Sequence, residues 1–269
     1  MSINKINVLV CGACGKMGTA VVEAVLEQSD LDIVALVDTS DELYTKATSL
    51  LGSNVDNIIL ETSLSKGINT ANPDVVVDFT NPNFVYDHTK TIIENGARPV
   101  IGTTGLTIDQ ITELSLLIDK KKLGGLVAPN FAIGAVLMME FSKKAAKYFD
   151  HVEIVELHHN KKLDAPSGTA IKTAEMMGEM QKTFSSTNVK DKELLQGARG
   201  AVSEKNIHIH SIRLPGLVAH QEVYLAGSSQ MLTIRHDSFD RKSFMPGVII
   251  AIRNVMSQSK LIYGLENIL

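Results

Sequence analysis

The sequence has little of what disulfide-rich secreted proteins and membrane proteins contain. It has two cysteines and no tryptophan, and no apolar run approaches the roughly 20 residues that a transmembrane helix requires. Two cysteines provide no disulfide framework, which fits a reducing compartment. The first residues lead directly into an apolar strand pattern without a basic segment, so we expect no signal peptide, no membrane partner and a cytoplasmic location.

An excess of charge of either sign is also absent. The chain has 26 Lys and Arg residues against 30 Asp and Glu residues, which gives a net charge of -4. Because no basic stripe stands out, we expect no nucleic-acid partner. With 269 residues, 44% of them hydrophobic and 21% charged, the chain is long enough to bury a core, either as one large domain or as two smaller ones.

Strand and helix patterns alternate through the first half of the chain. Apolar, β-branched runs typical of buried strands are separated by segments with apolar residues at helical spacing. The strands are expected at 5–11, 32–37, 74–79, 98–102 and 125–128, and the helices at 17–28, 84–95 and 109–121. Residues 39–72 are expected to hold a helix and a short strand. This alternation predicts an α/β fold with a doubly wound, Rossmann-type parallel sheet.

The pattern changes after Pro129. Three late strands follow one another without intervening helices, which indicates a mixed or antiparallel sheet. The expected elements are helices at 133–149, 168–181 and 248–256, strands at 151–158, 207–214, 222–226 and 231–236, and a polar, mobile loop with some helix at 183–206. We therefore predict a dinucleotide-binding domain at 1–129, an α+β substrate-binding and oligomerisation domain at 130–240, and a segment at 241–269 that packs back on the first domain.

A glycine-rich turn joins the first strand to the first helix. Its sequence is Gly12-Ala13-Cys14-Gly15-Lys16-Met17-Gly18. The spacing is G-x-x-G-x-x-G rather than the strict G-x-G-x-x-G of dinucleotide-binding folds. Glycine permits the tight turn and lets a pyrophosphate approach the helix N-terminus, where free N–H groups favour anions. We interpret the turn as a nucleotide site; the alternative is a thioredoxin-like redox pair formed by Cys11 and Cys14.

Asp38 ends the second strand about twenty residues after the glycine turn, where an acid accepts hydrogen bonds from the adenine ribose of a dinucleotide. The alternative is a helix cap or turn residue. A carboxylate here repels the 2′-phosphate of NADPH, and Thr39 brings no positive charge, although Lys16 partly offsets the repulsion. We therefore expect NADH to be used at least as well as NADPH.

The stretch from Glu156 to Ala170 gathers groups that suit proton transfer and anion binding. It reads Glu-Leu-His-His-Asn-Lys-Lys-Leu-Asp-Ala-Pro-Ser-Gly-Thr-Ala. A histidine or a lysine can donate a proton, and the free N–H groups of Gly168 and Thr169 at a helix start suit a carboxylate. The alternative is a surface loop that leads into a capped helix. The two adjacent histidines lack further ligands at metal-site spacing, so no metal is expected.

This stretch resembles the signature of the 4-hydroxy-tetrahydrodipicolinate reductase (dihydrodipicolinate reductase) family. Further segments that are similar to the family occur in the same order, so the resemblance covers nearly the whole chain. They are 12–18, Val77-Asp78-Phe79-Thr80, Gly102-Thr103-Thr104-Gly105, Ala128-Pro129-Asn130-Phe131, Arg213-Leu214-Pro215-Gly216 and Ile234-Arg235-His236-Asp237-Ser238.

The resemblance implies a role for each matching residue of the substrate site. His158 is implied as the proton donor or acceptor and Lys162 as a second proton donor. His159 is implied as a substrate contact, and the backbone of Gly168 and Thr169 as the site of a substrate carboxylate.

The resemblance also implies a binding site for NADH or NADPH. The implied contacts are Gly12, Ala13, Cys14, Gly15, Lys16, Met17, Asp38, Phe79, Thr80, Gly102, Thr103, Thr104, Ala128, Pro129, Asn130 and Phe131. The sequence departs from the family at two positions. Cys14 stands where many members have glycine, which crowds the turn slightly. Thr39 stands where some members have an arginine suited to NADPH.

The activity implied is the NAD(P)H-dependent reduction of 4-hydroxy-2,3,4,5-tetrahydrodipicolinate to 2,3,4,5-tetrahydrodipicolinate, with loss of water, in the diaminopimelate route of lysine biosynthesis. The resemblance further implies a homotetramer formed through the late strands. Two alternatives are an amino-acid dehydrogenase with the same two-domain plan and a non-catalytic NADH-binding protein.

The roles of three other residues remain undecided from the sequence. Arg213 suits either a substrate carboxylate or a structural ion pair. His208 and His210 share one strand face, which suits either a metal pair or a solvent or subunit surface.

Overall fold

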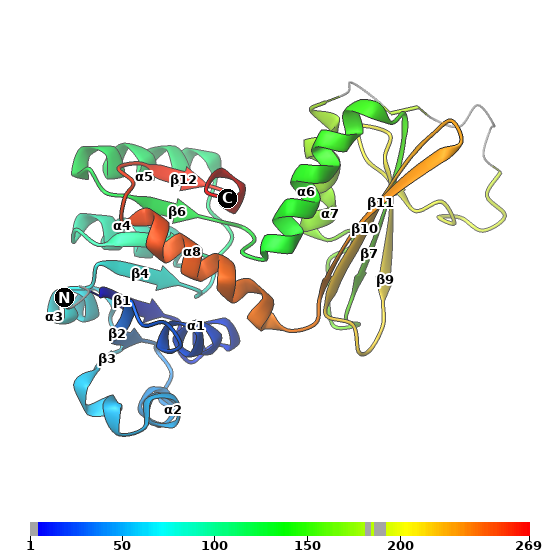
Figure 1. Cartoon of the computed structure of the whole chain (residues 1–269). Helices are drawn as coiled ribbons and strands as arrows, with labels where there is room; N and C mark the ends of the chain where they lie inside the picture. Colours follow the sequence, from blue (N-terminus) through cyan, green and yellow to red (C-terminus); the bar gives the residue numbers. More distant parts are fainter. Residues whose placement is uncertain (1–4, 181–183, 186–191) are drawn as a thin grey trace. The chain divides into compact units, whose positions relative to one another are not determined.

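The computed structural model describes residues 5–180, 184–185 and 192–269 (Figure 1). The chain forms two compact units. The first contains the chain up to Phe131 together with Phe244–Leu269, and the second contains Ala132–Ser243. Part of the loop expected at 183–206 falls on residues 183 and 186–191, which lie outside the described residues.

The first unit is built on a seven-stranded sheet in the order β12-β6-β5-β4-β1-β2-β3, and all its strand pairs are parallel. The strands are β1 Ile6–Cys11, β2 Leu31–Val37, β3 Ile59–Glu61, β4 Val75–Asp78, β5 Arg98–Ile101, β6 Gly125–Val127 and β12 Leu261–Tyr263. The helices are α1 Lys16–Leu26, α2 Leu43–Leu51, α3 Leu64–Ala71, α4 Val85–Glu94, α5 Ile108–Lys121 and α8 Met245–Val255. The predicted Rossmann-type fold class is confirmed.

The core of this sheet comes from its β-branched strands. Val8 and Val10 in β1 and all three valines of β4 are fully buried, because helices pack on the sheet and leave neither face to water. The order β2-β1-β4 places the carboxyl ends of these three strands side by side. That edge, where the strand order reverses direction, is where ligands bind in open α/β sheets.

Two elements of the first unit were not expected from the sequence. Strand β12 pairs parallel with β6 through Leu261, Ile262 and Tyr263; three residues are too few to produce a recognisable periodicity. Residues 39–72 contain α2, β3 and a second helix, α3, rather than a single helix and a strand. Helix α8 contacts α1 and β5 within the same unit.

The second unit is built on a five-stranded sheet in the order β11-β10-β7-β9-β8. Only the β7–β9 pair is parallel, so the sheet is mixed as expected. The strands are β7 His151–His158, β8 Ala201–Val202, β9 His208–Arg213, β10 Ala219–Gly227 and β11 Gln230–Ser238, and the helices are α6 Ile133–Ala145 and α7 Gly168–Gly178. Helix α6 is shorter than the expected 133–149 because a 3-10 turn, Ala146–Tyr148, follows it.

Helices α6 and α7 pack on one face of this sheet, and within the described residues the opposite face is only partly covered. Alternate residues of β7, including Ile154 and Glu156, are buried. Gln221 lies opposite Glu156 in β10 and donates a hydrogen bond to Thr173 of α7 (2.8 Å). The intervening residues, such as Val155, are only partly buried in the chain by itself.

Candidate cofactor and substrate sites

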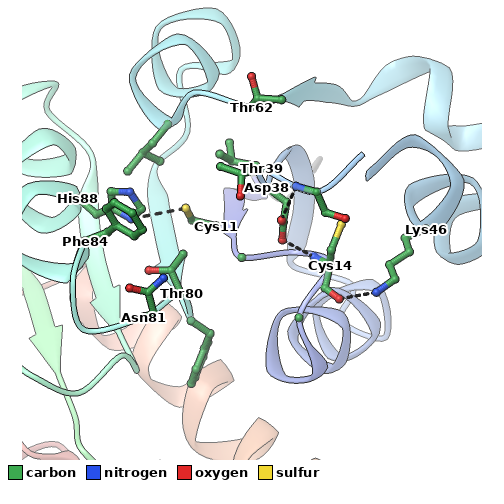
Figure 2. A pocket seen from close by; sticks show the side chains of 16 residues that line it. Cys11, Cys14, Asp38, Thr39, Lys46, Thr62, Thr80, Asn81, Phe84 and His88 are labelled. Atoms are coloured by element: carbon green, nitrogen blue, oxygen red, sulfur yellow. Dashed lines mark hydrogen bonds between the residues drawn. The ribbon is translucent and has the colours of Figure 1, made fainter. Parts of the chain in front are cut away.

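A cavity of about 460 Å³ lies at the carboxyl edge of the first sheet (Figure 2). Six of the residues expected to bind a cofactor line it: Gly12, Cys14, Gly15, Asp38, Phe79 and Thr80. Residues that the sequence analysis did not propose as contacts also line it: Cys11, Val37, Thr39, Ser40, Lys46, Thr62, Leu64, Asn81, Phe84 and His88. The remaining expected contacts, which are Ala13, Lys16, Met17, Gly102, Thr103, Thr104, Ala128, Pro129, Asn130 and Phe131, are not among the lining residues.

Two positions of the glycine turn, Gly12 and Gly18, are too tightly packed for a side chain. Gly12 has φ +79°, and a Cβ there would lie 2.7 Å from the carbonyl oxygen of Phe79. A Cβ on Gly18 would lie 2.0 Å from the carbonyl oxygen of Gly12, because α1 packs directly on the turn. These two glycines therefore allow the close packing of strand, turn and helix that leaves the turn backbone open to a ligand.

Both carboxylate oxygens of Asp38 accept a backbone hydrogen bond. Oδ2 accepts from the N–H of Cys14 (2.8 Å), and Oδ1 accepts from the N–H of Ser40 (2.9 Å). Asp38 therefore joins the glycine turn to the loop before α2, so the turn-residue interpretation is part of its role. Each oxygen keeps a lone pair that can accept a ribose hydroxyl.

Asp78 at the end of β4 is a fully buried carboxylate with four hydrogen-bond donors. Oδ1 accepts from the N–H and hydroxyl of Thr80 (3.0 and 2.8 Å) and from the hydroxyl of Thr103 (2.7 Å), while Oδ2 accepts from Nδ1 of His88 (2.8 Å). Burial alone would raise the pKa of Asp78, but hydrogen bonds from His88 and the two threonines outweigh burial and lower it. The ionised carboxylate thus fixes two expected cofactor contacts.

The two cysteines have the environment of inert thiols. Burial and the nearby Asp78 raise the pKa of Cys11 well above its usual value, and burial and Asp38 raise that of Cys14. A redox pair needs thiols whose pKa is lowered. The environment of these residues therefore favours the nucleotide-turn interpretation over the redox interpretation.

The expected contacts after β5 and β6 lie next to the end of β4. A Cβ on Gly102 would lie 2.0 Å from the ring of Phe79. The rings of Phe79 and Phe131 are 5.7 Å apart between centroids and tilted by 57°. Phe79 therefore packs against the segments that follow β5 and β6.

Glu156 organises the candidate site in the second unit. It is fully buried, and its Oε2 accepts hydrogen bonds from Nδ1 of His158 (2.5 Å) and Nη1 of Arg213 (2.8 Å). Its Oε1 accepts from Nη2 of Arg213 (2.7 Å) and the N–H of Ser167 (3.2 Å). Burial would raise the pKa of Glu156, but the bonds from His158 and Arg213 lower it to about 2. An ionised carboxylate only accepts, so Nδ1 of His158 carries the hydrogen of this bond, and the other ring nitrogen, Nε2, takes no part in it.

Arg213 is therefore a structural ion-pair residue, one of the two roles left open by the sequence. His208 and His210 have stacked rings with centroids 6.5 Å apart. His208 Nδ1 lies 2.6 Å from the carbonyl of Arg199, and His210 Nε2 lies 2.8 Å from Glu153. Among the described residues, neither this pair nor His158 and His159 belongs to a group of three close metal ligands.

His159 and Lys162 lie in the loop that joins β7 to the start of α7. Lys162 Nζ bonds both oxygens of Asp164 (2.8 and 2.7 Å). Nδ1 of His159 is buried and has no hydrogen-bond partner within the described part of the chain. The hydroxyl of Ser167 caps α7 by accepting from the N–H of Ala170 (3.2 Å). Gly168 is exposed, with open space beside its α-carbon.

Within the described residues, no helix is long and apolar enough to cross a membrane.

Both halves of the chain match models of one protein family. Residues 6–131 match a family model described as dihydrodipicolinate reductase, N-terminus, and residues 134–269 match the model described as its C-terminus. The matches adjoin and together cover almost all of the chain.

Individual relatives align over their full length. A 4-hydroxy-tetrahydrodipicolinate reductase from Listeria welshimeri is 54% identical over 97% of this chain and 99% of its own. One from a Picosynechococcus species is 50% identical over 100% of this chain and 99% of its own. The structure of a dipicolinate-bound dihydrodipicolinate reductase from Paenisporosarcina superposes with a TM-score of 0.90 and 46% identity, covering 98% of this chain and 100% of that one.

Proposed function

Because this chain belongs to the dihydrodipicolinate reductase family, we propose that it reduces 4-hydroxy-2,3,4,5-tetrahydrodipicolinate to 2,3,4,5-tetrahydrodipicolinate, with loss of water, using NADH or NADPH. The chain is an oxidoreductase of the diaminopimelate route to lysine. Full-length identity of about 50% to reductases disfavours both the amino-acid dehydrogenase and the non-catalytic NADH-binding protein.

The first unit fits a dinucleotide. Side chains at Gly12 and Gly18 would collide with backbone atoms, so the turn can present its own backbone to a pyrophosphate. Asp38 holds that turn and keeps lone pairs for the adenine ribose. The bound nicotinamide supplies the hydride. Phe79, Thr80 and the segments 102–104 and 128–131 complete its binding site, and Asp78 fixes Thr80 and Thr103 in place.

His158 and Lys162 supply the protons that the reaction requires. Glu156 fixes the ring of His158 so that Nε2 exchanges the proton that the substrate carbon requires after hydride addition. Lys162 serves as the second donor. Its ion pair with Asp164 is weak because the Asp164 side chain is 61% exposed, and water competes for such a pair. Substrate can therefore replace Asp164 as the partner of Lys162.

One substrate carboxylate binds at the start of α7. The N–H groups of Gly168 and Thr169 belong to the first turn, where helical N–H groups lack an intrahelical acceptor. The unpartnered Nδ1 of His159 provides a further group for the substrate, since a buried polar atom without a partner is costly. A dicarboxylate satisfies these donors together.

The partly covered face of the second sheet supports a homotetramer. Val155 and Leu157 of β7, Ile212 of β9 and Tyr224 of β10 are partly buried in the single chain, and Met231 of β11 is 64% exposed. A second copy placed on this face would remove that apolar surface from water. A cytoplasmic location suits an enzyme that draws on cellular NADH or NADPH.

The observation that carries the proposal is the Glu156–His158 pair, whose carboxylate also accepts a hydrogen bond from Ser167 at the start of α7. The test is oxidation of NADH by purified protein, with substrate made in situ from aspartate semialdehyde and pyruvate. We expect His158→Ala and Lys162→Ala each to lower kcat by about 100-fold or more, with the affinity for NADH kept. Lys161→Ala, an exposed neighbour, is the matched control. Tight NADH binding without turnover in the wild type would reject the proposal.

A further inference from the structure

A lysine from α2 reaches the glycine turn beside Asp38. The ammonium of Lys46 donates to the carbonyl oxygen of Cys14 (2.6 Å), while the N–H of the same Cys14 donates to Asp38 (2.8 Å). A cation and an anion are therefore attached to opposite ends of one residue. Figure 2 shows both side chains directed toward Cys14, and all three residues line the cavity.

Lys46 has spare capacity to bind an anion. An ammonium carries three N–H donors, and Cys14 accepts from one of them. Glu42, the N-cap residue of α2, forms an ion pair with Nζ at 3.7 Å, which is longer than a hydrogen bond, and its own side chain is 71% exposed, so water competes for this pair. The Lys46 side chain is 41% exposed, so a phosphate can approach it from the cavity. Thr39 and Ser40 also line this cavity.

Asp38 is thus not the only charged side chain near the expected ribose position. A lone carboxylate would repel a 2′-phosphate, but a lysine held at the same turn opposes that repulsion. The expectation that Lys16 supplies the offsetting charge has no support from the cavity. Lys16 is exposed at the start of α1 and is not a lining residue, whereas Lys46 is.

We propose that Lys46 determines whether this protein uses NADPH, by binding the 2′-phosphate of the adenine ribose. Asp38 and Lys46 then divide the recognition of the two cofactors. The Asp38 carboxylate accepts the ribose hydroxyls of NADH, and the Lys46 ammonium compensates when a phosphate replaces the 2′-hydroxyl. The inference rests on the proposed cofactor site but does not depend on the reaction catalysed there.

The test compares two nucleotides that differ only at the 2′ position. Binding of adenosine 2′,5′-bisphosphate and of 5′-AMP is measured by calorimetry for the wild type, Lys46→Met, Lys46→Arg and Lys120→Met. Lys120→Met removes the same charge from an exposed position of α5. We expect Lys46→Met to weaken the bisphosphate about tenfold and 5′-AMP less than twofold, Lys46→Arg to retain most of the affinity, and Lys120→Met to change neither.

Ionic strength gives a second readout. The advantage of the bisphosphate over 5′-AMP in the wild type is expected to shrink as salt is raised, because a half-exposed ion pair is screened. In Lys46→Met this salt dependence is expected to be smaller.

Equal weakening of both nucleotides by Lys46→Met would overturn the proposal, because Lys46 would then only support the turn through Cys14. No change in either nucleotide would overturn it as well. Because the assay measures binding, a protein that discriminates through Lys46 but turns over no substrate would reject the proposed function and leave this inference standing.

Discussion

Two buried carboxylates, one in each unit, hold a histidine in different electrostatic settings. Asp78 and Glu156 are both fully buried, and each accepts a hydrogen bond from Nδ1 of a histidine, at 2.8 Å from His88 and 2.5 Å from His158. The other donors differ. Asp78 is bonded by neutral groups of Thr80 and Thr103, whereas Glu156 is also bonded at both oxygens by Arg213.

The difference bears on what each histidine can do. The charge of Glu156 is already balanced by Arg213, so this buried carboxylate does not depend on His158 for a counter-charge. Asp78 has no such guanidinium among its hydrogen-bond donors, so its charge is stabilised by the hydrogen bonds from His88, Thr80 and Thr103. One arrangement suits a proton carrier and the other suits a fixed support for a binding site.

The largest effect on stability and turnover is expected from a substitution of Glu156. We expect Glu156→Gln to lower the free energy of unfolding by about 3–5 kcal/mol, because the charge of Arg213 is left without its buried partner. Turnover should fall with it, since His158 loses the acceptor that orients its ring. Urea unfolding and NADH oxidation measure the two effects. Glu153→Gln on the same strand, where the side chain is 35% exposed, should cost about 1 kcal/mol or less; an equal loss would contradict the balance described here.

Asp78→Asn should have a smaller effect on stability and a selective effect on binding. Loss of the charged acceptor should cost about 1–3 kcal/mol and raise the KM for NADH about tenfold, while the KM for substrate changes little. The reason is that asparagine accepts the bonds from Thr80 and Thr103 without a negative charge and places an amide N–H beside Nδ1 of His88, so the common anchor of the two threonines is weakened. Asp74→Asn provides a control at the opposite end of β4, where the carboxylate accepts from the N–H of Asn7. A destabilised variant with normal KM for NADH would show that Asp78 only supports the fold.

The smallest expected effect is the change in stability with pH that Glu156 causes. Glu156 has a pKa of about 2 in the folded protein against 4.5 in an unfolded chain. Its contribution is therefore complete above pH 4.5 and is lost as the pH falls toward 2. Between pH 4.5 and about 3.5 the stability advantage of wild type over Glu156→Gln should narrow by about 1 kcal/mol. Urea midpoints for both proteins across this range test it, and a constant difference would argue against the depressed pKa.

The sequence predicts the parts of the molecule that depend on local pattern. The parallel sheet follows from apolar runs alternating with helical spacing, and the turn from Gly12 to Gly18 marks the cofactor edge. Glu156, His158 and Ser167 lie within one short stretch, so their neighbourhood is visible before any fold is known.

The rest depends on pairings between distant segments. Asp78 is bonded by His88 and Thr103, which lie 10 and 25 positions away and show no common spacing. Lys46 was missed because the segment 39–72 has weak periodicity, so that no helix face could be assigned to it. The pairing of Arg213 with Glu156 spans 57 positions, which left its role open until the fold brought β7 and β9 together.

The parallel pairing of β12 with β6 also has a consequence for synthesis on the ribosome. Residues 132–243 are made between these two strands, so the nucleotide-binding unit receives its last strand only after the whole second unit has been translated. Until then the edge of β6 lacks its partner and α8 is absent from the face of the sheet beside α1. A nascent chain that ends at residue 131 would therefore expose apolar sheet surface, and the protein completes its first unit last.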